Sequence, residues 1–203
     1  MSEPVDPNLG RRGFFRDAVR RAMGPLAEYL EDRVPSLGEA ASSKKSRSIP
    51  LPLRPPGAVA ESSFLDTCFR CGACVTACPA NAIVPLSASA GRAARTPVVE
   101  PDNAACVVCE GLLCTHVCPS GALQPLSDPY DIDMGFAEVY GGLCVRSRGD
   151  ECTECVDKCP VADVAIRFND EGPPEVLSGC VGCGMCQLYC PTTPKAIVVQ
   201  PNR

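Results

Sequence analysis

Residues 180–191 read Cys-Val-Gly-Cys-Gly-Met-Cys-Gln-Leu-Tyr-Cys-Pro, which is the pattern C-x2-C-x2-C-x3-C-P. This spacing is typical of bacterial iron–sulfur proteins. The first three thiolates are close enough in the chain to wrap one face of a cubane cluster, and the fourth, followed by proline, is free to reach a different iron. Gly182 and Gly184 are predicted to let backbone N–H groups approach the cluster sulfides closely.

Three further runs of four cysteines precede this one, and each of them ends in Cys-Pro. The first run has the same spacing, the second has four residues between its second and third cysteines, and the third has seven between its first and second. The 16 cysteines therefore match the thiolate ligands of four [4Fe-4S] clusters, with none left over. The predicted iron ligands are Cys68, Cys71, Cys74, Cys78, Cys106, Cys109, Cys114, Cys118, Cys144, Cys152, Cys155, Cys159, Cys180, Cys183, Cys186 and Cys190.

Zinc and disulfides are the alternatives for so many cysteines. Zinc ribbons separate their C-x2-C pairs, and a third cysteine so close would crowd a tetrahedral site. Disulfide scaffolds are usually shorter, secreted chains that rarely repeat C-x2-C-x2-C. Iron–sulfur binding is therefore favoured. Aromatic residues make up only 5% of the chain and Trp is absent, so side chains alone would form a marginal core. We expect the chain without its clusters to be largely unfolded.

Charge separates the two parts of the chain. Residues 1–50 hold nine Lys/Arg and seven Asp/Glu, whereas residues 51–203 hold ten and seventeen, a net charge of −7. An acidic cysteine-rich part argues against nucleic acid as a partner.

Three segments follow from composition. We expect residues 1–34 to form a tail and an amphipathic helix, residues 35–60 a Pro/Ser-rich linker, and residues 61–203 the cluster-binding domain with four Cys-rich repeats. The first packed residues are expected near Leu53. Arg11-Arg12 resembles the start of a twin-arginine export signal, but charged residues interrupt the apolar segment that should follow. The helical stripe within residues 11–34 packs on the chain itself, on a partner subunit or on a membrane surface; the sequence leaves the three open. The stripe consists of Phe15, Val19, Ala22, Leu26 and Leu30.

The cysteine runs form a fourfold repeat, and each leads to a short apolar segment that is predicted to pair as a strand. These segments are 82–84, 121–123, 164–166 and 196–199, with 97–100 and 135–139 as candidate partners. The fold class expected is α+β, irregular and low in regular secondary structure, as a doubled bacterial 2[4Fe-4S] ferredoxin-like domain with an N-terminal amphipathic helix.

The fourth cysteine of one run ligates the cluster of another run in two-cluster ferredoxins. Pairing of neighbouring runs would place Cys118 with Cys68, Cys71 and Cys74. A nested pairing would place Cys190 there instead. The identical spacing of the first and last runs favours the nested pairing.

Residues 53–58 and 114–123, together with Met134-Gly135-Phe136-Ala137 and the seven-residue spacing of the third run, resemble the MauM/NapG family of ferredoxin-type proteins and, more distantly, NapF. The resemblance implies an iron–sulfur electron carrier without a substrate site of its own. It would relay single electrons in a quinol-linked respiratory chain, from a quinol-oxidising membrane protein towards a redox enzyme or its subunit.

Two alternatives remain for the function: a fixed electron-transfer subunit of a larger oxidoreductase, and a NapF-like maturation protein for a molybdenum reductase. The missing apolar signal segment implies a cytoplasmic protein, with peripheral membrane association through residues 11–34. Periplasmic location by twin-arginine export is the alternative.

Four other residues with polar or aromatic side chains lie close to the cysteines in the sequence. His116, the single histidine, is expected to be solvated or hydrogen-bonded rather than a ligand. Arg146 and Arg148 are expected in a solvated loop, with docking close to a cluster as the alternative. Tyr189 is expected to pack over a cluster.

Overall fold

A computed structural model describes residues 51–169 and 172–202 of the chain. The predicted tail, the amphipathic helix in residues 11–34, its apolar stripe and most of the linker lie outside the described residues. The described part belongs to one compact unit that begins at Pro50. Leu53 and Arg54 are already buried in it.

The helices of the described residues are short because each is confined between closely spaced cysteines, prolines and glycines. The α-helices are α2 (Glu61–Thr67), α3 (Ala73–Ala77), α4 (Leu113–His116), α5 (Glu154–Asp157) and α6 (Met185–Tyr189). Single turns of 3-10 helix lie at Gly91–Ala93, Glu110–Leu112, Pro129–Asp131, Gly141–Leu143, Val145–Arg148 and Ala162–Val164. This confirms the prediction of little regular secondary structure.

The strands form three separate antiparallel pairs. They are β1 (Ile83–Pro85) with β2 (Pro97–Val99), β3 (Gly135–Val139) with β6 (Ile197–Pro201), and β4 (Ile166–Arg167) with β5 (Glu175–Val176). The register pairs Ile83 with Val99 in the first and Val139 with Ile197 in the second. All four of these strands lie in segments that the sequence predicted as strands or candidate partners, although the sequence did not assign which segment pairs with which. The segment 121–123 forms only an isolated bridge, between Leu123 and Ala58.

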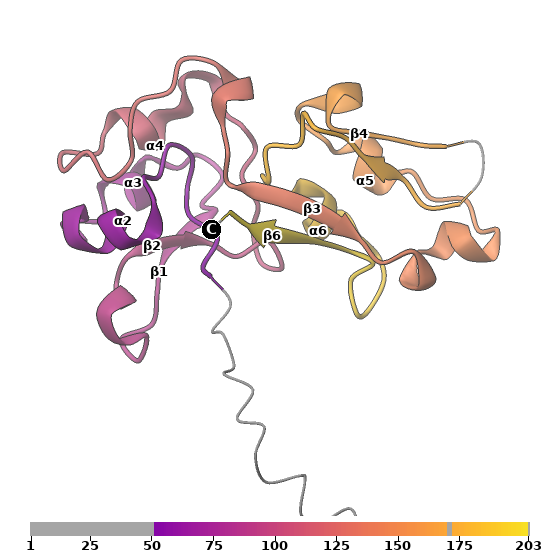
Figure 1. Cartoon of the computed structure of the whole chain (residues 1–203), viewed down its shortest axis with the longest axis horizontal. Helices are drawn as coiled ribbons and strands as arrows, with labels where there is room; N and C mark the ends of the chain where they lie inside the picture. Colours follow the sequence, from indigo (N-terminus) through magenta and orange to yellow (C-terminus); the bar gives the residue numbers. More distant parts are fainter. Residues whose placement is uncertain (1–50, 170–171, 203) are drawn as a thin grey trace, which may run out of the picture. The chain divides into compact units, whose positions relative to one another are not determined.

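The described chain repeats one plan twice, in an N-terminal half (residues 51–126) and a C-terminal half (residues 134–202). Each half has an inner hairpin, which is β1–β2 in one and β4–β5 in the other. Each is closed by a pairing of its first and last segments, Ala58 with Leu123 and β3 with β6. Helix α3 lies against α4, and α5 lies against α6. Figure 1 shows the elements of the first half, in indigo and magenta, on one side of the β3–β6 pair.

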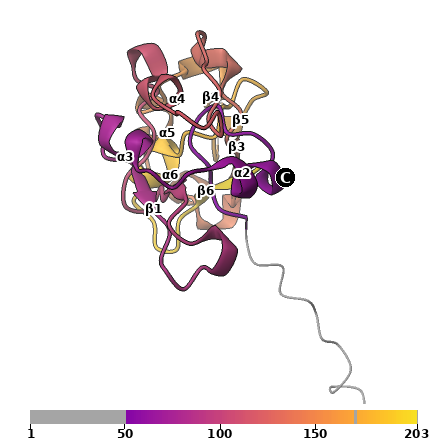
Figure 2. The same ribbon diagram turned by 90° about the vertical axis from the view of Figure 1, so that its left-hand side faces the viewer.

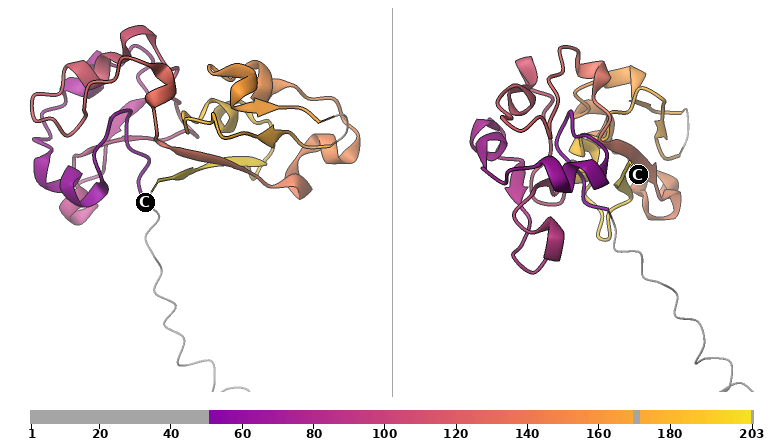
Figure 3. Two further views of the ribbon diagram at one scale, coloured as in Figure 1. Left: turned by 45° about the horizontal axis from the view of Figure 1, so that its top comes forward. Right: turned by 60° about the vertical axis from the view of Figure 1, so that its left-hand side comes forward.

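The β3–β6 pair runs alongside α6 near the junction of the two halves, as Figures 1 and 3 both show. Figure 2 shows the same ribbon from the side of the N-terminal half. The β3–β6 pair therefore lies close to the cysteine run from Cys180 to Cys190, which includes α6.

One apolar core extends through both halves and includes several cysteines. Phe64 and Leu123 are its largest fully buried apolar side chains. Next to them lies a buried arginine, Arg54, which donates to both carboxylate oxygens of Glu61 at 2.6 and 2.7 Å and to Thr96 Oγ1 at 2.8 Å. Its guanidinium also lies over the Phe64 ring, 4.6 Å from the centroid. Arg54 thus fixes α2 to the segment that leads into β2.

A backbone hydrogen bond and a side-chain hydrogen bond join the two halves. The N–H of Cys106 donates to the carbonyl oxygen of Cys183 at 3.0 Å. The buried amide of Gln187, on α6, donates to Asp102 of the other half at 2.8 Å, and its oxygen accepts the N–H of Val199 at 2.8 Å. These bonds hold α6 between the N-terminal half and β6.

Gly182 is required here for close packing. A Cβ atom on Gly182 would lie 2.5 Å from the backbone nitrogen of Gly135, so no other residue fits without a shift of β3. Its φ of 70° is also one that residues with a side chain rarely adopt. The sequence suggested a different reason, the approach of N–H groups to a cluster; the structure adds this steric one.

Within residues 51–169 and 172–202, none of the helices combines the length and the apolar character needed to cross a membrane.

Candidate iron–sulfur sites

Four cavities of the described chain are each lined by four cysteines, and together they account for all sixteen. We number them from one end to the other of the row that is described below. The first quartet is Cys68, Cys71, Cys74 and Cys118; the second is Cys78, Cys106, Cys109 and Cys114; the third is Cys159, Cys180, Cys183 and Cys186; the fourth is Cys144, Cys152, Cys155 and Cys190.

The grouping decides which cysteine runs are paired. Cys118 lies in the cavity of Cys68, Cys71 and Cys74, whereas Cys190 lies with the third run in the C-terminal half. The nested pairing favoured from the sequence is therefore wrong, and neighbouring runs exchange their end cysteines. The physical reason is the closure of each half on itself, since the Ala58–Leu123 bridge returns the end of the second run to the start of the first.

Local backbone geometry points the clustered cysteines into a common cavity. Gly72 and Gly184 follow the second cysteine of their runs and adopt left-handed conformations, with φ of 78° and 87°. Each is the N-cap of a one-turn helix that carries the third cysteine, Cys74 on α3 and Cys186 on α6. The reversal at glycine allows the third thiol to face the same cavity as the first two.

The packing of the elements that carry the cysteines, α3 against α4 and α5 against α6, puts the quartets in a row, and the electrostatic influence of thiols on one another follows the same order. Burial raises the pKa of Cys114 in the second quartet to about 12, and Cys74 of the first quartet is close enough to add to this rise. Burial likewise raises the pKa of Cys183 to about 12, with a further contribution from Cys106 of the second quartet. Cys155 of the fourth quartet adds to the raised pKa of Cys186. The first and fourth quartets are thus the ends of the row.

The two end quartets contain thiols with a different environment. Burial raises the pKa of Cys118, but hydrogen bonds outweigh it, from the Ser120 hydroxyl and then from backbone N–H groups, so the pKa lies below its ordinary value. Cys190 has a lowered pKa for the same reasons, with Thr192 in place of Ser120. The hydroxyl–sulfur distances are 3.5 Å for Cys118 and 3.2 Å for Cys190.

A backbone N–H orients each of these hydroxyls. Ala122 donates to Ser120 Oγ at 3.4 Å, and Ala196 donates to Thr192 Oγ1 at 2.8 Å. With a lone pair occupied in this way, the hydroxyl hydrogen is left to donate to sulfur. The equivalent positions after Cys78 and Cys159 are Ala80 and Val161, which have no hydroxyl.

Each end quartet also has a cationic side chain close to one of its cysteines. Arg70 donates to the carbonyl oxygen of Cys68 at 3.1 Å, and Lys195 donates to that of Cys190 at 2.7 Å. Hydrogen bonds to sulfur and nearby positive charge both favour the more negative state of a bound cluster. The two ends of the row are therefore built alike in this respect.

The residues present fit the cofactor that the spacing predicted. All sixteen cysteines are free thiols in this structure. Among the described residues, no three His, Cys, Asp or Glu side chains converge as closely as a single metal ion requires. Each quartet instead surrounds a cavity with mainly apolar walls, and four thiols around a space are the donor set of a [4Fe-4S] cluster.

The structure also places the other residues singled out from the sequence. His116 is exposed and its Nε2 lies 3.1 Å from the carbonyl oxygen of Leu126, as expected for a hydrogen-bonded side chain. Tyr189 lines none of the four cavities and is covered by the Lys158 ammonium, 5.2 Å from its ring centroid.

The two arginines of the third run differ from each other. Arg148 is exposed, as predicted. Arg146 is not in a solvated loop, because its Nε donates to the carbonyl oxygen of Gly172 at 2.8 Å and its guanidinium lies 4.4 Å from the centroid of Phe168. The prediction for Arg146 was wrong because its partners, Phe168 and Gly172, lie more than twenty residues further along the chain, and the local sequence does not show that they come close.

Comparison with known proteins agrees with this geometry. Residues 67–122 match the family model described as a 4Fe-4S dicluster domain, and residues 177–193 match one described as a 4Fe-4S binding domain. The fold and the thiol-lined cavities define a ferredoxin-type iron–sulfur protein.

The relatives define the family more closely. The chain is 35% identical to the ferredoxin-type protein NapG of Escherichia coli over 99% of this chain and 90% of that protein. It is 35% identical to the methylamine utilization ferredoxin-type protein MauM of Methylobacillus flagellatus, over 95% and 84% of the two chains. The ferredoxin-type protein NapF of Escherichia coli is 32% identical over 70% of this chain and 81% of its own length. The chain belongs to the NapG/MauM family of ferredoxin-type proteins.

Proposed function

We propose that each quartet holds one [4Fe-4S] cluster and that the chain carries single electrons between the two ends of the row. The observation that supports this most strongly is the division of sixteen thiols into four cavities. Neighbouring elements link these cavities in order, since α3 lies against α4, Cys106 bonds to Cys183, and α5 lies against α6. A bound cluster supplies a site that gains or loses one electron without a change of covalent structure.

The chain's own groups would prepare each cavity for its cluster. Burial raises the pKa of Cys74, Cys106 and Cys155 to about 11, so these thiols are protonated at neutral pH before iron arrives. These thiols would hold the cluster as thiolates, so each would have to give up its proton when the site is filled. In the second, third and fourth cavities, where no thiol is exposed, the apolar walls would limit the access of water to the sulfur atoms.

We further propose a quinol-linked respiratory role, with a quinol-oxidising membrane protein as donor and a redox enzyme or its subunit as acceptor. Membership of the NapG/MauM family supports it, and the name of the MauM relatives ties one branch to methylamine utilization. Residues 11–34 would attach the chain to the membrane partner through their apolar stripe. The chain would have no substrate site of its own.

Anaerobic coulometric reduction tests the carrier role, because a chain with four one-electron sites should take up about four electrons. Membranes supplied with a reduced quinone test the donor. They should reduce the full-length wild-type chain faster than a Phe15→Asp, Leu26→Asp double variant, with a Ser42→Asp, Ser48→Asp variant as the matched control. Uptake of two electrons or fewer would contradict the carrier with four sites, and equal rates for all three chains would contradict the role of residues 11–34.

A further inference from the structure

One thiol of the sixteen differs from the rest in accessibility. Cys71 of the first quartet is exposed, whereas the other fifteen are buried or half-buried. The cavity of the first quartet has a volume of about 290 Å³, against about 30 Å³ for the fourth, the other end of the row. Because electron tunnelling slows steeply with distance, the most accessible end of the row is where a partner protein can exchange electrons fastest.

An exposed aromatic residue lies at the same opening. Phe69, between the first two cysteines of the quartet, lines this cavity and has 70% of its surface exposed. A single exposed aromatic residue is unremarkable on its own. At the rim of a redox site it is well placed as a contact, since aromatic and arginine side chains contribute most to protein interfaces.

The opening is also positively charged. Arg70 and Arg95 line the cavity, and no carboxylate does. Arg70 donates only to neutral carbonyl groups, those of Cys68, Ala94, Leu65 and Arg92, so its charge is not neutralised by these contacts. Arg95 is exposed. This basic opening lies in a region, residues 51–203, whose net charge is −7 with ten Lys/Arg against seventeen Asp/Glu.

The other end of the row lacks this combination. The cavity of the fourth quartet is lined by Arg146 and Glu154, which carry opposite charges, and none of its thiols is fully exposed. The fourth quartet thus also has cations nearby, Arg146 in its cavity lining and Lys195 beside Cys190, but a carboxylate lies among them. The exposed thiol and a lining with two arginines and no carboxylate distinguish the first quartet.

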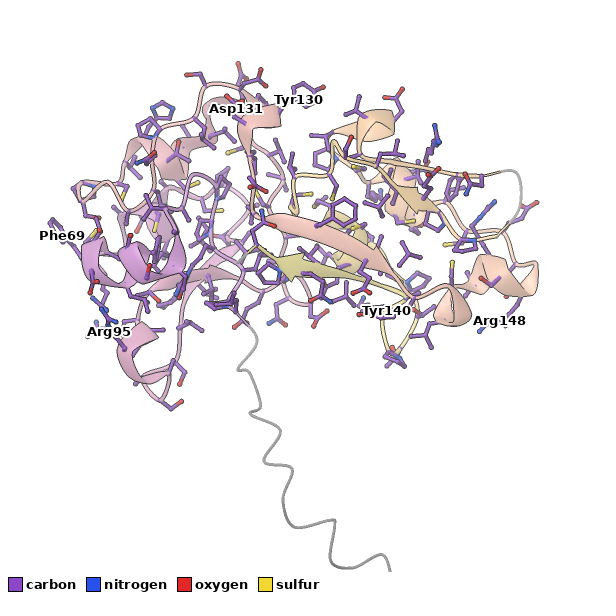
Figure 4. All side chains as sticks on the ribbon, in the orientation of Figure 1. Phe69, Arg95, Tyr130, Asp131, Tyr140 and Arg148 are labelled. Atoms are coloured by element: carbon purple, nitrogen blue, oxygen red, sulfur yellow. The ribbon has the colours of Figure 1, made fainter. Side chains whose placement is uncertain are left out.

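We infer that Phe69, Arg70 and Arg95 form a docking surface around Cys71 for an electron-transfer protein with acidic side chains around its own redox group. This inference deepens the proposed function and rests on it, because the surface serves a cluster in the first quartet. Opposite charges steer the two proteins together, and the aromatic contact holds them while the electron passes. Figure 4 shows Phe69 and Arg95 projecting from the same side of the chain, away from Tyr130 and Arg148.

The test uses the full-length chain loaded anaerobically, with a reduced acidic bacterial 2[4Fe-4S] ferredoxin as the probe. One electron leaves the ferredoxin and is taken up by the chain, and stopped-flow absorbance follows the transfer. The variants are Arg95→Glu and Phe69→Ser. Their matched controls are Arg148→Glu, whose side chain is 61% exposed, and Tyr130→Ser, which is 63% exposed. Iron and sulfide are measured first for every protein.

At low ionic strength, Arg95→Glu should lower the second-order rate constant about tenfold, since steering by opposite charge accelerates association by that order or more. Phe69→Ser should lower it about fivefold through loss of a contact at the interface. In 1 M salt, where the Debye length is about 3 Å, the effect of Arg95→Glu should disappear. With the basic protein cytochrome c, in oxidised form, as an acceptor from the reduced chain, Arg95→Glu should cause no loss of rate.

Unchanged rates in both variants at full iron content would overturn the docking surface and leave the proposed function intact. So would an equal loss of rate in Arg148→Glu and Tyr130→Ser. If Arg95→Glu assembles poorly, Arg95→Gln removes the charge with less disturbance and should give a smaller loss in the same direction. A wild-type chain without iron would overturn the proposed function itself, and this inference with it.

Discussion

The backbone N–H of Cys106 lies 3.0 Å from the carbonyl oxygen of Cys183, to which it donates a hydrogen bond. Cys106 belongs to the second quartet and Cys183 to the third, so main-chain atoms of two cysteine-bearing loops touch at the middle of the row. The two halves of the chain thus meet through residues proposed as ligands. Any change that separates the halves should interrupt the row at this point.

Gln187 should be important for holding the halves together. Gln187→Leu removes the acceptor of the buried Val199 N–H and the donor to Asp102, and an unsatisfied buried donor costs about 1–3 kcal/mol. Urea unfolding of the anaerobic protein, followed by far-UV circular dichroism, should show a loss of this size. Gln200→Leu changes an exposed amide and should be nearly neutral. Equal stability of the two variants would show that Gln187 makes no net contribution.

Paired cysteine substitutions should report which cysteines share a site. Cys71→Ser with Cys118→Ser removes two ligands of one quartet and should cost about four irons per chain. Cys71→Ser with Cys190→Ser removes ligands of two quartets and should cost about eight. Iron analysis of the purified variants makes the measurement. The reverse order of losses would restore the nested pairing.

The hydroxyls of Ser120 and Thr192 should raise the reduction potentials of the end sites. Ser120→Ala and Thr192→Val each remove a hydroxyl that lies beside a thiol, and hydrogen bonds to sulfur stabilise the reduced form. A redox titration followed by electron paramagnetic resonance should show one of four potentials falling in each variant. Ser63→Ala, on the exposed face of α2, is the control. A shift of no potential, or of all four together, would contradict a local effect.

Arg54 should contribute to stability through its buried contacts. Arg54→Met removes the hydrogen bonds from Arg54 to Glu61 and Thr96. The free energy of unfolding should fall by about 2–4 kcal/mol. This loss is smaller than is usual for breaking a fully buried ion pair, because Glu61 is partly exposed. The exposed pair Arg167–Glu175 provides the comparison, since Arg167→Met should cost less than about 1 kcal/mol. Denaturant titration of both variants measures the two losses of stability. Equal losses would mean that the buried contacts of Arg54 contribute no more than those of an exposed ion pair.

The sequence was sufficient for features that depend on residues close together in the chain. The spacing from Cys180 to Cys190 predicted an iron–sulfur site, and the apolar segments after Cys78 and Cys190 were correctly predicted as strands. The two-residue strand β5, Glu175–Val176, was not predicted, because it lies in a segment rich in Pro and Gly with no alternation of apolar residues.

Features that depend on distant residues were harder to predict. The spacing within a run is the same whether Cys118 or Cys190 returns to Cys68, so it does not determine the pairing. Arg54 and Gln187 look like ordinary polar residues until their partners Thr96 and Asp102 are placed beside them. The hydroxyls did leave a local signal, since Cys-Pro-Ser and Cys-Pro-Thr mark the second and fourth runs and not the other two.

The most direct test of four clusters in one chain is the iron and acid-labile sulfide content of the full-length protein, purified without oxygen and related to protein mass from amino-acid analysis. Four filled quartets predict about sixteen irons and about sixteen sulfides per chain. A folded protein with eight irons or fewer would contradict the account, because at least two of the four thiol-lined cavities would then not be cluster sites.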